Sequence, residues 1–248
     1  MYVTVGAERM LTFDTFMPPS ADLPPPPENP ELPPDVRIPD EEDLAFRTED
    51  GLLLEGRGYF PENAQRCIAL CHPHPLYGGT FNNAIVVSIA KRLREQAAET
   101  VGWLRLNYRG VGRSEGRYDA ANREVLDVLA AFGEIRYRLP KATVSVMGYS
   151  FGAGVAYRAS VRDNRIDRVC LVAPTLRMMR DQMGEYTGPL QIVAASNDEF
   201  ATVEESAELG QKLNAPVHMI EGADHFFVRH RREVAGVVLR FLAPGLVP

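Results

Sequence analysis

Three residues of this chain carry the side chains of a nucleophile, a base and an acid: Ser150, His225 and Asp198. Each comes a few residues after a short apolar run of the kind that forms a buried strand. A serine hydroxyl becomes a good nucleophile only when a neighbouring base removes its proton, and an acid must fix the tautomer of that base. Together the three residue types predict attack of Ser150 on a carbonyl carbon, which is acyl-transfer chemistry.

Ser150 lies in the motif Gly148-x-Ser150-x-Gly152, between the strand-like run Val144–Met147 and a stretch of small, helix-compatible residues. A serine at a sharp strand-to-helix turn is held in a strained backbone conformation. The residues two positions away must lack side chains, so that strand and helix can pass closely. The motif therefore predicts a nucleophile elbow. The alternative is a glycine-rich turn with an incidental serine, and the strand before and helix after favour the elbow.

Asp198, Glu199 and Asp224 are the candidates for the acid. Asp224 adjoins His225, so its carboxylate is badly placed to reach the imidazole nitrogen that faces away from the serine. Asp198 follows a strand and lies at the sheet edge where Ser150 is also expected. Asp198 is therefore the preferred acid, and Glu199 is a weaker rival.

The negative charge that develops on the attacked carbonyl oxygen needs two backbone N–H donors, in what is called an oxyanion hole. Phe151, directly after the nucleophile, is expected to supply one. The loop after the third strand should supply the other, but its Pro73 and Pro75 have no N–H. This leaves the backbone of His74 as the expected donor, with Leu76 as the less favoured choice.

Two other kinds of site are alternatives to this interpretation. His72 and His74 could join Asp198 and His225 as metal ligands, but one of two alternating side chains at a strand end faces away, and no metal is expected. Gly110–Gly112 could suggest a dinucleotide loop, but the third glycine and the following acidic residue of that motif are missing. The sequence therefore predicts neither a metal nor an organic cofactor.

Strand-like and helix-like segments alternate along the chain, which is typical of a parallel sheet covered on both faces. A hairpin around Glu49–Gly51 opens the domain. The expected strands are Leu44–Thr48, Leu52–Phe60, Cys67–Cys71, Val101–Leu106, Thr143–Met147, Arg168–Val172, Leu190–Ala194 and Val217–Ile220. Helical spacing of apolar residues is clearest at Ile85, Ile89 and Leu93, at Val125, Val128, Leu129 and Phe132, and at Val234, Val237, Val238, Phe241 and Leu242.

Three stretches carry a resemblance to a known family: HPHPLYGG at 72–79, NYRGVGRSEG at 107–116 and GYSFG at 148–152. With the chain order serine, aspartate, histidine, they make the chain resemble a small bacterial group of the α/β-hydrolase superfamily. The resemblance runs from about Leu44 to the C-terminus and does not cover the preceding proline-rich segment. It implies an α/β-hydrolase fold, with a mostly parallel central sheet and helices on both faces.

In that fold the loop 107–114 shapes a wall of the active site, and lids are usually inserted between the strands that end near Val172 and begin near Leu190. Asn107 stands where many relatives have aspartate, so an ion pair from this position to Arg109 is not expected. The lid interval has room only for one short helix with Met178, Met179 and Met183. A minimal lid and an open pocket are expected, lined by Leu76, Tyr77, Tyr149, Met179, Phe200 and Phe226.

Composition predicts one globular domain preceded by an arm, since 45% of the 248 residues are hydrophobic and 24% are charged. Residues 1–40 form the expected arm, which is rich in proline from residue 18, and residues 41–248 form the expected hydrolase domain. The arm is predicted to lie along the surface or along a neighbouring subunit in a homo-oligomer. A proline-rich ligand for the aromatic groove of a partner is the less favoured alternative. The acidic run Asp40–Asp43 is expected to be solvated.

Charge and hydropathy limit the partners and the compartment. The net charge of −6 and the absence of a basic face argue against nucleic acid. No apolar run reaches the roughly 18 residues of a membrane span, and the N-terminus lacks the pattern of a signal peptide. A cytoplasmic protein without membrane contact is expected. Cys67 and Cys71 would lie about 13 Å apart on one strand, too far for a disulfide, and Cys170 lies on another strand.

These features together predict a serine hydrolase that cleaves an ester, thioester or related acyl bond of a small molecule through an acyl-serine intermediate. The same triad could instead serve a cyclase, a lyase or an acyltransferase, because only the pocket distinguishes these reactions. A catalytically silent binding protein is a third possibility, against which the intact Ser150, Asp198 and His225 argue. The identity of the substrate does not follow from the sequence.

Overall fold

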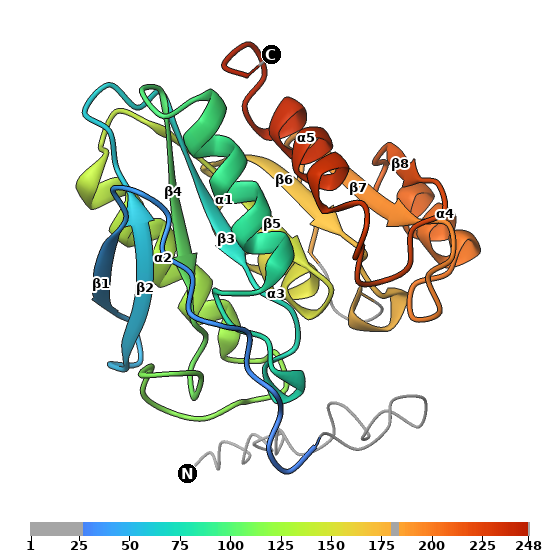
Figure 1. The fold of residues 1–248 in the computed structure, drawn as a ribbon, viewed down its shortest axis with the longest axis horizontal. Helices are drawn as coiled ribbons and strands as arrows, with labels where there is room; N and C mark the ends of the chain where they lie inside the picture. The colour runs from blue at the N-terminus through green and yellow to red at the C-terminus, as the bar shows by residue number, and fades with distance from the viewer. Residues whose placement is uncertain (1–26, 180–183, 248) are drawn as a thin grey trace, which may run out of the picture.

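The computed structural model describes residues 27–179 and 184–247. In this part of the chain eight strands form one sheet in the order β1-β2-β4-β3-β5-β6-β7-β8 (Figure 1). β1 and β2 form an antiparallel hairpin, β2 is also antiparallel to β4, and the other neighbours are parallel. The strands are β1 (Glu42–Arg47), β2 (Leu53–Tyr59), β3 (Arg66–Cys71), β4 (Val101–Leu106), β5 (Thr143–Tyr149), β6 (Ile166–Val172), β7 (Leu190–Ala195) and β8 (Val217–Ile220).

The expected strands are confirmed, with ends that differ by only one or two residues. β4 is buried along its whole length, and β5 is exposed only at Thr143. Such continuous burial is what a strand inside a parallel sheet experiences, because helices cover both of its faces. The hairpin turn is also confirmed: Thr48 N–H donates to the carbonyl of Leu52, and Gly51 takes a positive φ of 90°.

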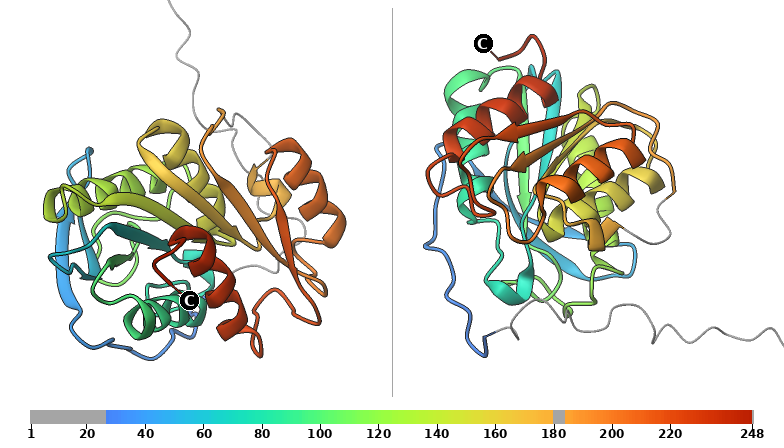
Figure 2. Two further views of the ribbon diagram at one scale, coloured as in Figure 1. Left: turned by 90° about the horizontal axis from the view of Figure 1, so that it is seen from above. Right: turned by 90° about the vertical axis from the view of Figure 1, so that its right-hand side faces the viewer.

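Helices cover both faces of the sheet (Figure 2). α1 (Ala84–Gln96) and α5 (Arg231–Leu242) pack together on one face, and α2 (Glu124–Arg138), α3 (Phe151–Arg162) and α4 (Val203–Lys212) lie on the other. Each face has its own apolar cluster, formed by the spaced side chains that the sequence predicts. Among the described residues, no helix is both long enough and apolar enough to cross a membrane.

The interval between β6 and β7 contains little regular structure. Its described residues, 173–179 and 184–189, hold one 3-10 turn, η2 (Leu176–Met179), in place of the short helix that the sequence predicts. Met183, which was expected on that helix, lies outside the described residues. The described part of this interval therefore carries no lid helix.

The three cysteines, Cys67, Cys71 and Cys170, are buried free thiols, as expected from their strand positions. Burial raises the pKa of each thiol, to about 12 at Cys71. A thiol with a raised pKa carries little thiolate and is a poor nucleophile. The cysteines therefore act as small apolar core residues.

The described end of the N-terminal arm packs on the domain, while residues 1–26 lie outside the described part. Ile38 is buried against the α1 and α5 face of the sheet. The carbonyl of Val36 accepts hydrogen bonds from Arg57, at 3.0 Å, and from Arg105, at 3.1 Å. Further back, the carbonyl oxygen of Glu31 passes so close to Gly78 that a Cβ there would lie 2.7 Å from it.

The expectation that the acidic run is solvated is wrong for one of its four residues. The side chains of Asp40, Glu42 and Asp43 are exposed, but that of Glu41 is 0% exposed and pairs with Arg105 at 2.5 Å. Trp103 also donates its indole N–H to Glu41, at 2.8 Å. A fully buried guanidinium on β4 needs a carboxylate partner, and Glu41 is the residue that supplies it.

These contacts lead us to expect different outcomes from two truncations at the predicted domain boundary. Deletion of residues 1–33 keeps Ile38 and the carbonyl of Val36, and should leave the melting temperature within a few degrees of the full chain. Deletion of residues 1–40 removes both, and should lower the free energy of unfolding by about 2–5 kcal/mol, the usual cost of losing a buried isoleucine side chain.

The point substitution Ile38→Ala is the matched control, because it removes the same side chain without shortening the chain. Thermal and urea unfolding of the four proteins measures these differences, and size-exclusion chromatography tests whether the arm also holds an oligomer. Equal stability of the 1–40 truncation and the full chain would contradict the packing role of Ile38 and support a boundary at residue 40.

Candidate active site

Ser150 lies at the sharp turn between β5 and α3. Its φ of 53° and ψ of −116° fall in a region that residues with a side chain rarely adopt. A Cβ at Gly148 would lie 2.2 Å from the carbonyl oxygen of Gly152, and one at Gly152 would lie 2.4 Å from that of His72. Both glycines are therefore required for the close passage of strand, helix and the loop after β3. This is the geometry that the elbow motif predicts.

The structure brings together the three residues that the sequence singles out. Nδ1 of His225 lies 2.8 Å from Oδ2 of Asp198, and Nε2 of His225 lies 3.0 Å from Oγ of Ser150. An ionised carboxylate only accepts hydrogen bonds, so Nδ1 carries the proton and Nε2 is free to accept one from the serine hydroxyl. The histidine is thus in the tautomer that a base for Ser150 requires.

The loop after β7 fixes the carboxylate of Asp198. The side chain of Asp198 is fully buried. Its Oδ1 accepts hydrogen bonds from the backbone N–H groups of Phe200, at 2.8 Å, and Ala201, at 2.9 Å. This leaves Oδ2 pointing at the imidazole. The rival acids Glu199 and Asp224 are both exposed, and neither is in hydrogen-bond contact with the ring of His225.

The loop after β3 lies against the start of α3, where the N–H of Phe151, the first helical residue, has no partner within the helix. The ring of His74 lies 4.9 Å from the ring of Phe151, so the two expected oxyanion donors are on adjoining segments. The N–H of Leu76, the alternative donor, points to Nδ1 of His74 at 3.3 Å. This occupied N–H favours the backbone of His74 over Leu76.

The imidazole of His74 also contacts Tyr118, a residue that the sequence did not single out. Nδ1 of His74 accepts from Leu76, so Nε2 carries the proton and donates to the Tyr118 hydroxyl oxygen at 3.1 Å. Burial, assisted by the nearby Arg177 cation, lowers the pKa of His74 to about 4. The ring is therefore neutral near pH 7 and supports the loop through hydrogen bonds and ring contacts.

His72 is a buried structural histidine. Its Nδ1 lies 2.7 Å from the carbonyl of Pro73, and its Nε2 accepts the backbone N–H of Tyr108 at 3.3 Å. With both ring nitrogens engaged by backbone, His72 has no lone pair left for a metal. Among the described residues, no group of three or more His, Cys, Asp or Glu side chains could hold a metal ion.

The burial of His72 makes a prediction for stability against pH. Burial lowers its pKa from 6.5 to about 3. Between those two values the unfolded chain binds a proton that the folded chain excludes. The contribution of His72 to stability is therefore complete above pH 6.5 and is lost as the pH falls toward 3. When the pH is lowered from about 7 to about 5, the free energy of unfolding should therefore fall less in His72→Gln than in the wild type.

Urea unfolding of both proteins across this range measures the difference. His218→Gln is the control, since His218 is exposed on β8 and its replacement should leave the pH dependence unchanged. A His72→Gln variant with the same pH dependence as the wild type would show that other groups control the loss of stability in acid.

The residues expected to line the pocket divide into two sets. Four of them are exposed at the edge of the sheet where the site lies: Leu76, Tyr77, Phe200 and Phe226. The other two are buried. Tyr149 is 2% exposed and donates its hydroxyl to the carbonyl of His225 at 2.8 Å, so it supports the histidine from behind. Met179 is 0% exposed and belongs to the core cluster around α3.

The wall loop after β4 is held by carboxylates that the sequence analysis missed. Arg109 pairs with Asp127 on α2 and with Asp50 in the hairpin turn, each at 2.8 Å. Asn107 instead donates to Glu55 at 2.8 Å and takes no part in an ion pair with Arg109. An acidic residue on the apolar face of a helix, such as Asp127, is the signal that could have pointed to a buried arginine partner.

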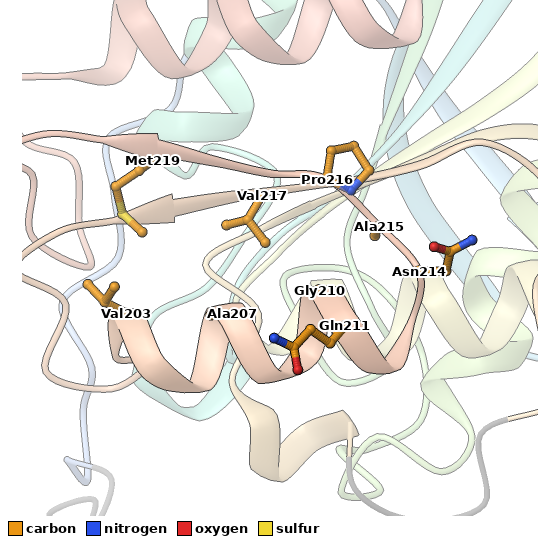
Figure 3. A pocket seen from close by; sticks show the side chains of 9 residues that line it. All are labelled: Val203, Ala207, Gly210, Gln211, Asn214, Ala215, Pro216, Val217 and Met219. Atoms are coloured by element: carbon orange, nitrogen blue, oxygen red, sulfur yellow. The ribbon is translucent and has the colours of Figure 1, made fainter.

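A groove of about 550 Å³ lies between α4 and β8, at the edge of the sheet (Figure 3). Val203 and Met219 line one end of it, and Asn214 lines the other. None of its lining residues is Ser150, Asp198 or His225. The volume of this groove is therefore separate from the site around the serine.

Comparison with known proteins agrees with this arrangement. The sequence model of the dienelactone hydrolase family matches residues 114–238 of the 248. An uncharacterized protein of Rickettsia prowazekii is 32% identical over 193 residues, which are 73% of this chain and 79% of the relative.

Two solved structures share the fold at more than a quarter sequence identity. A candidate α/β hydrolase of unknown function from Agrobacterium tumefaciens superimposes with a TM-score of 0.73 at 27% identity, over 84% of this chain and 99% of that chain. An α/β serine hydrolase homologue from Coxiella burnetii superimposes with a TM-score of 0.72 at 28% identity, over 84% of this chain and 100% of that chain. The fold is also that of a lidless α/β serine hydrolase from Xanthomonas campestris, with a TM-score of 0.72 at 23% identity over 84% and 95%.

The chain thus has the α/β-hydrolase fold, with its serine elbow at the end of β5 and the two partner residues on the loops after β7 and β8. Its family match covers half of the sequence and includes Ser150, Asp198 and His225. The protein is a hydrolase of the α/β fold and belongs to the dienelactone hydrolase family.

Proposed function

We propose that the protein is a serine hydrolase that cleaves an ester, thioester or related acyl bond of a small molecule through an acyl-Ser150 intermediate. One observation carries the proposal: two hydrogen bonds, of 2.8 and 3.0 Å, join Asp198 to His225 and His225 to the strained Ser150. The hydrolase family and the serine hydrolase homologue from Coxiella burnetii support it. The motifs at 72–79, 107–116 and 148–152 further favour the small bacterial group of this superfamily.

Acylation follows from the hydrogen-bond pattern. Nε2 of His225 takes the hydroxyl proton of Ser150 while Oγ attacks the carbonyl carbon, and the carbonyl π electrons move to the oxygen. The N–H groups of Phe151 and His74 are the proposed donors to this oxyanion. When the oxyanion collapses, the bond to the leaving oxygen or sulfur breaks, and the leaving atom takes the proton from Nε2. Asp198 remains ionised and stabilises the imidazolium throughout.

Deacylation repeats these steps with water in place of the serine. His225 takes a proton from water as the water oxygen attacks the acyl carbon, and then returns a proton to Oγ of Ser150 as the acyl bond breaks. The products are a carboxylic acid and the free enzyme. This route uses only side chains and backbone groups of the protein, so the proposal requires neither a metal nor an organic cofactor.

The proposal is tested by trapping the serine. A fluorophosphonate should label the wild-type protein once, on the peptide that contains Ser150, as mapped by mass spectrometry. A panel of nitrophenyl esters and acyl thioesters should be hydrolysed, and preincubation with the fluorophosphonate should abolish that turnover in proportion to labelling. Turnover that persists in fully labelled protein, or label on another residue, would reject an acyl-Ser150 intermediate.

A further inference from the structure

Two phenylalanines beside His225 are unusually open to solvent. Phe200 is 36% exposed and Phe226 is 58% exposed. Their rings stand edge-on to the imidazole, with centroids at 5.0 and 5.6 Å, and lie 6.2 Å from one another. Exposed aromatic side chains that adjoin each other are a typical mark of a binding surface. We call this pair the Phe200–Phe226 surface.

The backbone that forms the triad also fixes this surface. The N–H of Phe200 donates to Oδ1 of Asp198, so the ring is attached to the residue that orients the histidine. Phe226 lies between His225 and Phe227, which is fully buried and has a positive φ of 49°. The backbone reversal at Phe227 places that ring in the core and leaves the ring of Phe226 outside. The surface therefore belongs to the same two loops as Asp198 and His225.

The proposed reaction defines which part of a substrate can reach this surface. The leaving oxygen or sulfur must lie beside Nε2 of His225, because it takes its proton from that atom. The carbonyl oxygen must point to the N–H groups of Phe151 and His74, which come from α3 and from the loop after β3. The group attached to the leaving atom therefore extends past the imidazole of His225, on which the rings of Phe200 and Phe226 pack.

We propose that the Phe200–Phe226 surface binds the leaving group of the substrate, and that this group is an alcohol or thiol with an aromatic or other ring-sized apolar body. The inference rests on the serine hydrolase function proposed above. Two exposed rings offer apolar area and aromatic contacts. A small polar alcohol would leave both rings in water. Binding of this kind lowers KM for apolar leaving groups and does not change the sequence of bond-breaking steps.

Three acetate esters isolate the effect of the leaving group on kcat/KM: ethyl, benzyl and cyclohexylmethyl acetate. They share one acyl group, and all release a primary alcohol, so differences in intrinsic reactivity are small. Titration of the released acid measures kcat/KM for each. We expect the wild type to prefer the benzyl and cyclohexylmethyl esters over the ethyl ester by about tenfold or more, within the range that one apolar contact can supply.

Phe226→Ala should reduce this benzyl-to-ethyl ratio about tenfold, mainly through KM for the benzyl ester. Phe200→Ala should act in the same direction, since its backbone N–H to Asp198 is retained. Val228→Ala is the matched control, because Val228 is another apolar side chain of this loop and is 56% exposed. The ratio should stay at the wild-type value in that variant.

Two failures can be told apart. If the wild type hydrolyses the three esters with equal kcat/KM, or if Val228→Ala lowers the ratio as much as Phe226→Ala does, the leaving-group inference is wrong while the serine hydrolase function stands. If no ester is hydrolysed and the fluorophosphonate does not label Ser150, both fall together. A Phe226→Ala variant with an unchanged ratio and an altered elution volume in size-exclusion chromatography would assign the surface to contact between copies of the chain.

Discussion

Ser150→Ala should fold like the wild type and lose ester hydrolysis by on the order of 10⁴-fold or more, as expected when a triad loses its nucleophile. The hydroxyl is the only group removed, and its hydrogen-bond partner is Nε2 of His225, at 3.0 Å. Cβ remains, so the packing of the elbow against Gly148 and Gly152 is unchanged. Steady-state kinetics with a nitrophenyl ester measures the loss, and circular dichroism with thermal unfolding measures the fold.

Ser150→Gly is the informative companion variant. It also removes the nucleophile, and in addition it removes the Cβ that is held at a φ of 53°. Glycine adopts this conformation without strain, so the variant should be as inactive as Ser150→Ala and should melt higher than it. Fluorophosphonate labelling that survives in either variant would show that another residue is the nucleophile.

The strands and the meeting of Ser150, Asp198 and His225 could be predicted from the sequence because each depends on local signals. A β-branched run such as that of β5 forms a buried strand in any parallel sheet, and a glycine two residues either side of Ser150 is a steric requirement of the turn. Parallel strands also bring their carboxyl ends to one edge. Side chains that are far apart in sequence, such as Asp198 and His225, therefore meet without any need to know the exact packing.

The features that the sequence could not predict depend on how deeply a side chain is buried and on contacts between residues that are far apart in the sequence. Tyr149 is next to Ser150 in sequence and Met179 lies in the interval between β6 and β7, yet both side chains are buried in the core clusters. Glu41 sits in an acidic run that looks solvated, and only the fold places it beside the buried Arg105. Tyr118 reaches His74 from a loop whose path no local pattern defines.

Asp198→Asn should lower turnover by about 10⁴-fold, the effect of the equivalent change in a serine protease that serves as the standard example. The carboxylate accepts from Phe200, Ala201 and His225. An amide that keeps its oxygen toward the two backbone N–H groups must turn its NH₂ toward Nδ1. Nδ1 then becomes an acceptor, and the proton moves to Nε2, the atom that should receive the proton of Ser150. The variant therefore holds the wrong tautomer.

Asp224→Asn is the matched control, since Asp224 is adjacent to His225 in sequence, carries the same charge and is exposed. Its side chain does not hydrogen-bond to the ring, so this variant should keep turnover within about tenfold of the wild type. Thermal unfolding should show that both variants are folded. The free energy of unfolding of Asp198→Asn should be lower than that of the wild type by about 1–3 kcal/mol, because its buried hydrogen bond to His225 is no longer assisted by a charge. A folded Asp224→Asn without activity, beside an active Asp198→Asn, would make Asp224 the acid and require His225 to turn its Nδ1 away from the loop after β7.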